Sequence, residues 1–199
     1  GAPAGARGAP RCPHPVTQVT ETARTVAAAL AEDRPEISRS LTVHWQDPMA
    51  MASRGLEMAG LDYMKAVLNR EVPPPPIAVL MNMAPVEVDE GRAVFAAIPG
   101  EEHYNPIGVV HGGFMATVLD SVAGCAVHTT LALGEAYTTL TLEVKNLRPL
   151  TRDTGAIRGV GEVEYRGRRQ ATANANIYAE ESGKLLASAS STCMIMGNQ

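Results

Sequence analysis

One segment limits the possible folds of this chain more than any other, and it is the apolar run at residues 111–132. We predict a single long helix there, ended near Gly134, because apolar residues at helical spacing cover nearly all of its faces. They include Phe114, Val118, Val122 and Val127. A helix that is apolar on most sides must be buried on most sides, so the rest of the fold has to wrap around it.

Strand-like runs flank this helix on both sides. Two precede it and four follow it, at residues 83–88, 92–98, 136–147, 155–165, 169–178 and 185–196. Short turns separate these runs, which favours antiparallel neighbours. The order predicts an α+β fold in which one antiparallel β-sheet wraps a long central helix, while a partner subunit covers the remaining face.

The first 76 residues are expected to add helical segments to that domain. Residues 1–46 form an N-terminal extension, partly disordered where Gly, Ala and Pro dominate, with one helix over residues 16–33. Residues 47–76 are predicted to form one helix and a proline-rich linker that pack on the core. Asp47 is its expected N-cap and Pro48 its first residue. The main domain spans residues 77–199.

Composition narrows the function classes. The 199 residues carry a net charge of −4, with 45% hydrophobic and 19% charged residues, which is typical of a globular protein. The chain has neither a basic field for nucleic acid nor an apolar run long enough to span a membrane. The three cysteines form no C-x-x-C pair, and the five histidines have no metal-ligand spacing. We therefore expect no metal site and no disulfide framework, and a cytoplasmic location.

The chemistry is expected where a loop becomes the long helix, at His111-Gly112-Gly113. The first N–H groups of a helix have no acceptor within it, and glycines let a ligand approach them closely. A carbonyl oxygen held there would be polarised, so this sequence predicts an oxyanion hole.

Asp120 is the only acidic residue of the helix, and it lies among apolar neighbours. Burying a charge is costly, which favours a functional role. The alternatives are that Asp120 caps a neighbouring loop or pairs with an arginine. Asp120 lies eight residues beyond Gly112, or about 12 Å along the axis at ~1.5 Å per residue. Two antiparallel copies of the helix would bring Gly112 of one to Asp120 of the other, so an active site would be shared across a two-fold interface.

Together, Asn105, His111-Gly112-Gly113 and Asp120 resemble the PaaI-like (phenylacetyl-CoA) thioesterase family of hotdog proteins, and the likeness extends over roughly residues 56–196. The resemblance implies a hotdog domain over residues 77–199 that hydrolyses acyl-CoA as a homodimer or homotetramer. CoA is part of the substrate, and no other cofactor is implied.

The resemblance also implies roles for individual residues. The Gly112 N–H and the Asn105 side chain would polarise the thioester carbonyl. Asp120 of the partner subunit would act as general base or as nucleophile, and a hydroxyl residue on the next strand would orient the water. Thr139 is the expected residue for this, with Thr138 and Thr141 as rivals. His111 is expected to shape the loop beside the oxyanion hole.

Two of these assignments have alternatives. Asn105 could serve only as a turn-former before Pro106. His111 could instead be a general base.

Several further residues are candidates for substrate contacts. Gly113 would help to line the oxyanion site. Arg166, Arg168 and Arg169 form a cluster at a strand-to-strand turn and could bind the CoA phosphates or simply be solvated, with Arg148 and Arg152 as further candidates. An apolar set could cap the acyl pocket or merely pack: Met58, Leu61, Met64, Leu68 and Ile77.

Two rival functions and one rival nucleophile stay open at this stage. A hotdog hydratase or dehydratase would require the His111 ring to reach the substrate, and an acyl-CoA-binding protein would need no turnover. Cys125 and His128 are three residues apart on the helix and could form a Cys–His pair, although no third residue to orient it is evident.

Overall fold

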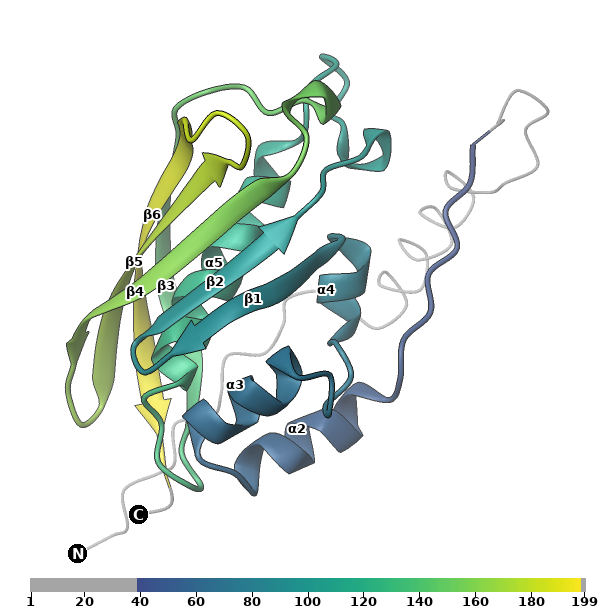
Figure 1. Ribbon diagram of the computed structural model, residues 1–199. Helices are drawn as coiled ribbons and strands as arrows, with labels where there is room; N and C mark the ends of the chain where they lie inside the picture. Colours follow the sequence, from purple (N-terminus) through teal and green to yellow (C-terminus); the bar gives the residue numbers. More distant parts are fainter. Residues whose placement is uncertain (1–38, 198–199) are drawn as a thin grey trace, which may run out of the picture. The chain divides into compact units, whose positions relative to one another are not determined.

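The structure, a computed structural model, describes residues 39–197 (Figure 1). The predicted disordered stretch at 1–15 and the predicted helix at 16–33 lie outside the described residues.

Within the described residues, one antiparallel sheet forms the framework of the domain. Its strands are β1 (Met83–Asp89), β2 (Arg92–Ala97), β3 (Ala136–Asn146), β4 (Ile157–Arg166), β5 (Gln170–Ala179) and β6 (Leu185–Met196). They are ordered β1-β2-β4-β5-β6-β3, and every neighbouring pair is antiparallel. The connection through the long helix therefore carries β3 to one edge of the sheet, while β1 forms the other edge.

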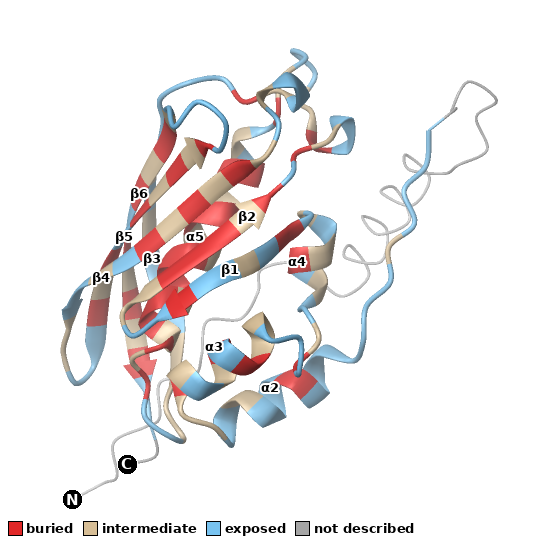
Figure 2. Ribbon diagram, in the orientation of Figure 1, coloured by how far each residue is buried: buried red, intermediate tan, exposed pale blue. Residues whose placement is uncertain are grey.

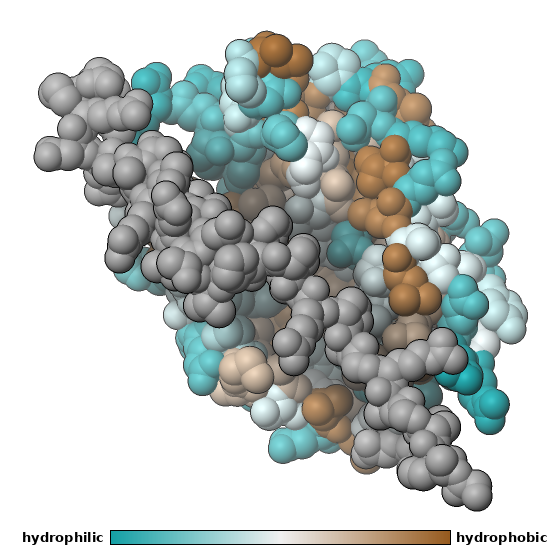
Figure 3. Space-filling view, turned by 180° about the vertical axis from the view of Figure 1, so that it is seen from behind, coloured by the Kyte–Doolittle hydropathy of each residue, from teal (hydrophilic) through white to brown (hydrophobic). Residues whose placement is uncertain are grey.

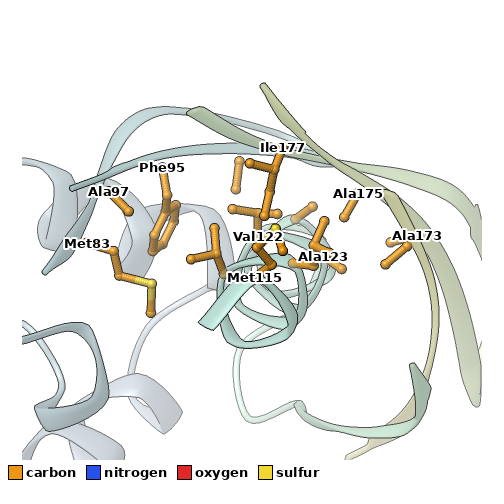
Figure 4. Packing of buried hydrophobic residues seen from close by; sticks show 14 of the residues in the cluster. Met83, Phe95, Ala97, Met115, Val122, Ala123, Ala173, Ala175 and Ile177 are labelled. Carbon is orange, nitrogen blue, oxygen red and sulfur yellow. The ribbon is translucent and has the colours of Figure 1, made fainter. Parts of the chain in front are cut away.

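The long helix, α5 (Gly112–His128), lies against one face of this sheet and contacts β2 through β6 (Figure 1). This arrangement confirms the predicted α+β hotdog fold. The close packing depends on small residues where the helix crosses the strands. A Cβ atom at Gly161 of β4 would lie 2.1 Å from the carbonyl oxygen of Val122. On β5, Ala173 and Ala175 are buried against the helix beside Ala123 (Figure 4).

Burial alternates along the central strands, as expected for a sheet with one covered face (Figure 2). On β5 the alanines and Ile177 point inward, while Asn174 and its neighbours on the same face remain accessible. The predicted alternation of residues 171–177 is therefore confirmed.

Helix α5 is shorter than the predicted segment 111–132, and two threonines provide the reason. The Thr129 hydroxyl donates to the carbonyl of Ala126 at 2.6 Å, and the Thr130 hydroxyl donates to that of Val127 at 2.7 Å. These bonds satisfy carbonyls of the last turn that would otherwise need further helical residues. The helix therefore ends at His128, before Gly134.

Between residue 39 and the sheet, the chain contains three helices: α2 (Pro48–Leu56), α3 (Gly60–Leu68) and α4 (Pro76–Leu80). The Asp47 cap is confirmed, since its carboxylate accepts from the Met49 N–H at 2.9 Å. The single helix predicted after it is wrong. Gly60 packs so closely on the end of α5 that a Cβ there would lie 1.7 Å from the His128 carbonyl oxygen, and its N–H donates to Leu131 O at 2.9 Å. This close contact accompanies the break between α2 and α3.

Helix α4 was not predicted. Its first residue is Pro76, so the last proline of the expected linker begins a short helix instead of extending the stiff segment.

Candidate active site

The His111 side chain caps the N-terminus of α5. Its Nδ1 accepts a hydrogen bond from the Gly113 N–H at 2.8 Å, and its own backbone N–H donates to the His103 carbonyl at 2.8 Å. A Cβ at position 113 would lie only 2.8 Å from His111 Nδ1, so a glycine is required for this cap. The cap also occupies the Gly113 N–H, which leaves the Gly112 N–H as the donor of the first turn open to a ligand.

The same hydrogen bond fixes the tautomer of His111. A ring nitrogen that accepts an N–H carries no proton, so the neutral imidazole holds its proton on Nε2. The nitrogen that faces away from the cap is therefore a donor. This state suits a role in shaping the loop and does not suit general-base chemistry, which a hydratase built on His111 would need.

Asn105 holds the loop that leads into α5. Its side-chain oxygen accepts from the N–H groups of Ile107 at 3.1 Å and Val109 at 3.4 Å, and its backbone N–H donates to Val109 O at 2.9 Å. Asn105 is therefore a turn-former, as its place before Pro106 indicated. Because the side-chain oxygen is engaged, the NH2 group is the part of this side chain that can serve a ligand.

Asp120 is half-buried and contacts a single hydroxyl residue of β3. The Thr139 Oγ1 donates to Asp120 Oδ1 at 3.0 Å. A β-bulge lies between Thr139 and Thr141, and both Thr138 and Thr141 are exposed. Of the three threonines considered, the structure therefore brings Thr139 to the carboxylate. Within residues 39–197 no ion pair and no loop N–H bond to Asp120 is found, so neither of its alternative structural roles is observed.

One residue near the helix start was not anticipated. Asn146, the last residue of β3, lies beside Gly112, and a Cβ at position 112 would come within 3.0 Å of its Nδ2. The sequence offers no signal for this proximity, because 34 residues separate the two positions and only the register of β3 brings them together. Strand β3 thus runs past both ends of the site, with Asn146 at Gly112 and Thr139 at Asp120.

A pocket of about 290 Å³ opens beside the N-terminus of α5. Its lining combines apolar and polar side chains, among them Met81, Tyr104, Phe114, Glu102, His111 and Thr117. The Thr117 hydroxyl donates to the Gly113 carbonyl at 2.9 Å. The pocket borders the capped turn and has the mixed lining typical of a ligand site.

The apolar residues that could have capped the acyl pocket instead pack in the core or face solvent. Met64 is buried in the main core, Leu61 and Leu68 pack against it, and Met58 joins a small cluster around Met51. Ile77 is exposed. None of these residues lines the pocket beside α5.

The five arginines considered for binding the CoA phosphates lie in two groups, one near each end of α5. Arg166 pairs with Glu135 at 2.7 Å and also contacts Thr130, so its guanidinium is engaged in joining the β4–β5 hairpin to the end of the helix. Arg168 and Arg169 are exposed on that hairpin.

Arg148 and Arg152 lie near the other end of α5. Their loop contains Leu150, whose carbonyl accepts from the Val110 N–H at 2.8 Å, just before the capped turn. Arg148 donates from its guanidinium to Leu185 O.

Cys125 and His128 do not form an activated pair. Burial, with a smaller effect of the Asp120 carboxylate, raises the pKa of the Cys125 thiol to about 12. Burial lowers the pKa of His128, whose Nε2 is buried without a hydrogen-bond partner among the described residues. The His128 ring lies between Tyr63, at 5.2 Å, and Tyr137, at 5.8 Å. A protonated thiol beside a neutral, aromatic-packed imidazole is not a nucleophile.

In the described part of the chain, no three side chains of His, Cys, Asp or Glu come together as a metal site would require. Across the same residues, the helices are too short or too polar to cross a bilayer.

Comparisons with known proteins point to one family. The family model described as the thioesterase superfamily matches residues 107–186, which include the whole of α5. A phenylacetic acid degradation-related protein from Ralstonia eutropha is 32% identical over 66% of this chain and 98% of its own, with a TM-score of 0.60.

Two PaaI structures are also similar. A variant of the phenylacetic acid degradation protein PaaI from Thermus thermophilus is 26% identical over 60% of this chain and 97% of its own, with a TM-score of 0.54. The E. coli PaaI protein, at 18% identity over 71% of this chain and 97% of its own, shares the fold with a TM-score of 0.60. No curated protein sequence matches with significance.

Proposed function

Because this chain belongs to the PaaI-like family of hotdog thioesterases, we propose that it hydrolyses acyl-CoA thioesters to the free acid and CoA. The reaction needs a group that delivers water or attacks directly, and a group that stabilises the oxyanion of the tetrahedral intermediate. Asp120 and the Gly112 N–H are the groups assigned to these two tasks.

The observation that carries the proposal is the hydrogen bond between Thr139 and Asp120. A carboxylate on an apolar helix needs polar contacts, and here a hydroxyl supplies one while the carboxylate stays half-exposed. Asp120 can then take a proton from a water molecule as it attacks the thioester carbon, with Thr139 helping to orient carboxylate and water. Alternatively, the carboxylate attacks the carbon itself, the C–S bond breaks and CoA leaves as the thiolate, which takes a proton from solvent. Water then cleaves the resulting anhydride to the free acid and regenerates Asp120.

The carbonyl side of the reaction is assigned to the capped turn of α5. The Gly112 N–H points out of the helix start with no acceptor among the described residues, at the positive end of the helix dipole. The NH2 group of Asn105 is the second assigned donor, since its oxygen already holds the loop. Together these donors would lower the energy of the oxyanion more than that of the neutral carbonyl.

The active site would be completed by a second copy of the chain. Along one helix the two groups stand about 12 Å apart, too far to act on one carbonyl. Strand β3 is an edge strand whose outer side has no partner among the described residues, and its bulge residue Leu140 is 54% exposed. Antiparallel pairing of two β3 strands would set Gly112 of each protomer against Asp120 of the partner subunit.

The side opposite that of Figure 1 exposes apolar residues among polar ones (Figure 3). From the open edge of β3 and the separation of the two groups along α5, we propose a homodimer, or a homotetramer made of such dimers.

Binding of the CoA phosphates is assigned to the exposed arginines. Arg168 and Arg169 remain available on the hairpin, and Arg152 and Arg148 flank the capped turn. Arg166 is the weakest candidate, because releasing its guanidinium would break the ion pair with Glu135.

The proposal is tested by measuring free-thiol release across a panel of acyl-CoAs with wild type and Asp120→Asn. The amide keeps the size of the carboxylate and its acceptor for Thr139, but it is neither a base nor a nucleophile. We expect kcat to fall by about 10²–10⁴-fold. Asp62→Asn, an exposed acid in α3, is the matched control and should be unchanged.

Three outcomes would contradict the proposal. They are turnover in Asp120→Asn equal to wild type, saturable binding with no turnover by wild type, and conversion of enoyl-CoA without thiol release. The last two correspond to a binding protein and to a hydratase.

A further inference from the structure

We propose that Asn146 contacts the substrate as a further hydrogen-bond donor to the thioester carbonyl, from its Nδ2 beside the Gly112 N–H. The inference rests on the proposed function and adds a residue to it that is supplied by the sheet and not by the helix or its loop.

Proximity is the first support. The Nδ2 of Asn146 lies 3.0 Å from the point where a side chain at position 112 would begin. An oxygen bound to the Gly112 N–H sits next to the same glycine, within reach of a donor placed there. A side chain at position 112 would come between the amide and the bound oxygen, which gives a physical reason for glycine at the first residue of α5.

Availability is the second support. Three other polar side chains around this turn each make at least one hydrogen bond within the protein. The Asn105 oxygen holds two loop N–H groups, His111 Nδ1 caps Gly113, and the Thr117 hydroxyl donates to Gly113 O. The Asn146 side chain has no hydrogen-bond partner among residues 39–197 and is exposed. Its NH2 group is therefore an unused donor at the helix start.

The place of Asn146 on β3 is the third support. Asn146 and Thr139 lie on the same strand, and each contacts one of the two halves of the proposed site. Pairing of two β3 strands around a two-fold axis near Leu142 and Glu143 would bring Asn146 of one protomer toward Thr139 of the partner subunit. Strand β3, which would form the dimer contact, would then also place a hydrogen-bond donor for the thioester carbonyl close to Asp120 of the partner subunit.

The first test compares Asn146→Ala and Asn146→Asp with the control Asn174→Ala. Asn174 is an exposed asparagine on β5, on the face of the sheet away from α5. If Asn146 donates to the developing oxyanion, Asn146→Ala lowers kcat by about 10²-fold with KM nearly unchanged. Asn146→Asp has the same shape but cannot donate, so it should be at least as slow. The control should retain wild-type kcat. Wild-type kcat in both Asn146 variants would overturn the inference.

A binding measurement separates this contact from a merely structural role. The ligands are a ketone analogue of the best acyl-CoA, with CH2 in place of sulfur, and the S-alkyl-CoA of the same chain, which has no carbonyl. We expect Asn146→Ala to weaken the ketone by about tenfold while leaving the thioether unchanged. Equal losses for both ligands, or none for the ketone, would refute the contact.

The proposed function can fail on its own. If wild type releases no thiol from any acyl-CoA, the thioesterase proposal falls, and the ketone and thioether still decide whether Asn146 contacts a carbonyl. A wild type that does not prefer the ketone over the thioether refutes the inference in that case as well.

Discussion

The two ends of helix α5 face the same strand but differ in what surrounds their polar groups. At the N-terminal end, the Gly112 N–H has no acceptor among the described residues, the Asn146 side chain is exposed, and a pocket of about 290 Å³ borders His111 and Gly113. At the C-terminal end, His128 is enclosed by Tyr63 and Tyr137, and the Tyr137 hydroxyl reaches within 2.4 Å of where a Cβ at Gly124 would be. Asp120 lies between these two environments.

Residue type alone therefore does not identify reactive groups on this helix. Cys125 and His128 are nucleophile and base by type, but burial raises the pKa of the thiol and lowers the pKa of the imidazole, so both stay uncharged at neutral pH. Gly112 has no side chain at all, yet its N–H has no acceptor among the described residues and is the group we propose for a developing oxyanion. We therefore place the oxyanion donor at the N-terminal end of the helix.

Removal of the Gly112 N–H is expected to have the largest effect on turnover. Gly112→Pro deletes the N–H and also places a ring against the Asn146 amide, and proline is well tolerated at the first position of a helix. The preceding residue His111 has φ −60° and ψ 137°, a conformation allowed before proline, so the fold should be retained. We expect kcat for thiol release to fall by about 10²–10³-fold. Gly108→Ala, in the exposed loop before the helix, is the control for general loop damage.

A mixture of two inactive variants tests whether each active site is shared between two protomers. If each site combines Gly112 of one protomer with Asp120 of the other, a mixed dimer of Gly112→Pro and Asp120→Asn holds one intact site and one doubly damaged site. Random re-pairing of equal amounts should then restore about a quarter of wild-type activity. No recovery, in a mixture shown by mass spectrometry to contain mixed dimers, would mean that each protomer carries its own complete site.

Much of this organisation could be predicted from the sequence, because it depends on local patterns. Periodicity located α5 and the strands to within a few residues, and the cap at Asp47 follows from an acid placed before a proline. The contact of Thr139 with Asp120 was expected only from the family resemblance, which left Thr138 and Thr141 as rivals.

Contacts between distant segments could not be predicted in this way. The break at Gly60 depends on the end of α5, and the place of Asn146 depends on the register of β3, including its bulge. The engagement of Arg166 by Glu135 likewise joins a hairpin to a turn 31 residues away. Local sequence carries no record of such pairings, since they are set by packing in three dimensions.

The burial of His128, at the C-terminal end of α5, predicts a pH effect on stability. Burial lowers the pKa of His128 in the folded protein below the ordinary value of 6.5. At a pH between the folded-state pKa and 6.5, the unfolded chain therefore binds a proton that the folded chain does not. The stability associated with neutral His128 is therefore fully present above pH 6.5 and is lost as the pH falls toward the folded-state pKa. In urea titrations at pH 7.5 and 5.5, His128→Leu should lose less stability on acidification than wild type. His44→Gln, at an exposed histidine, should behave like wild type, and a parallel decline in wild type and His128→Leu would exclude this role.

The smallest expected effect concerns Cys125. A pKa of about 12, against an ordinary value of 9.0, reduces the thiolate fraction at pH 8 by about a thousandfold. We therefore expect Cys125 in the folded protein to escape alkylation by iodoacetamide under conditions that label the urea-unfolded chain, as followed by peptide mass spectrometry. Cys125→Ala should change kcat by less than about twofold, since a buried thiol that packs can be replaced at small cost. A large loss of turnover in Cys125→Ala, together with rapid labelling of the folded protein, would instead show that Cys125 is reactive. The contrast between the two ends of α5 would then no longer hold. Slow labelling with full activity would leave Asp120 as the reactive side chain of the helix.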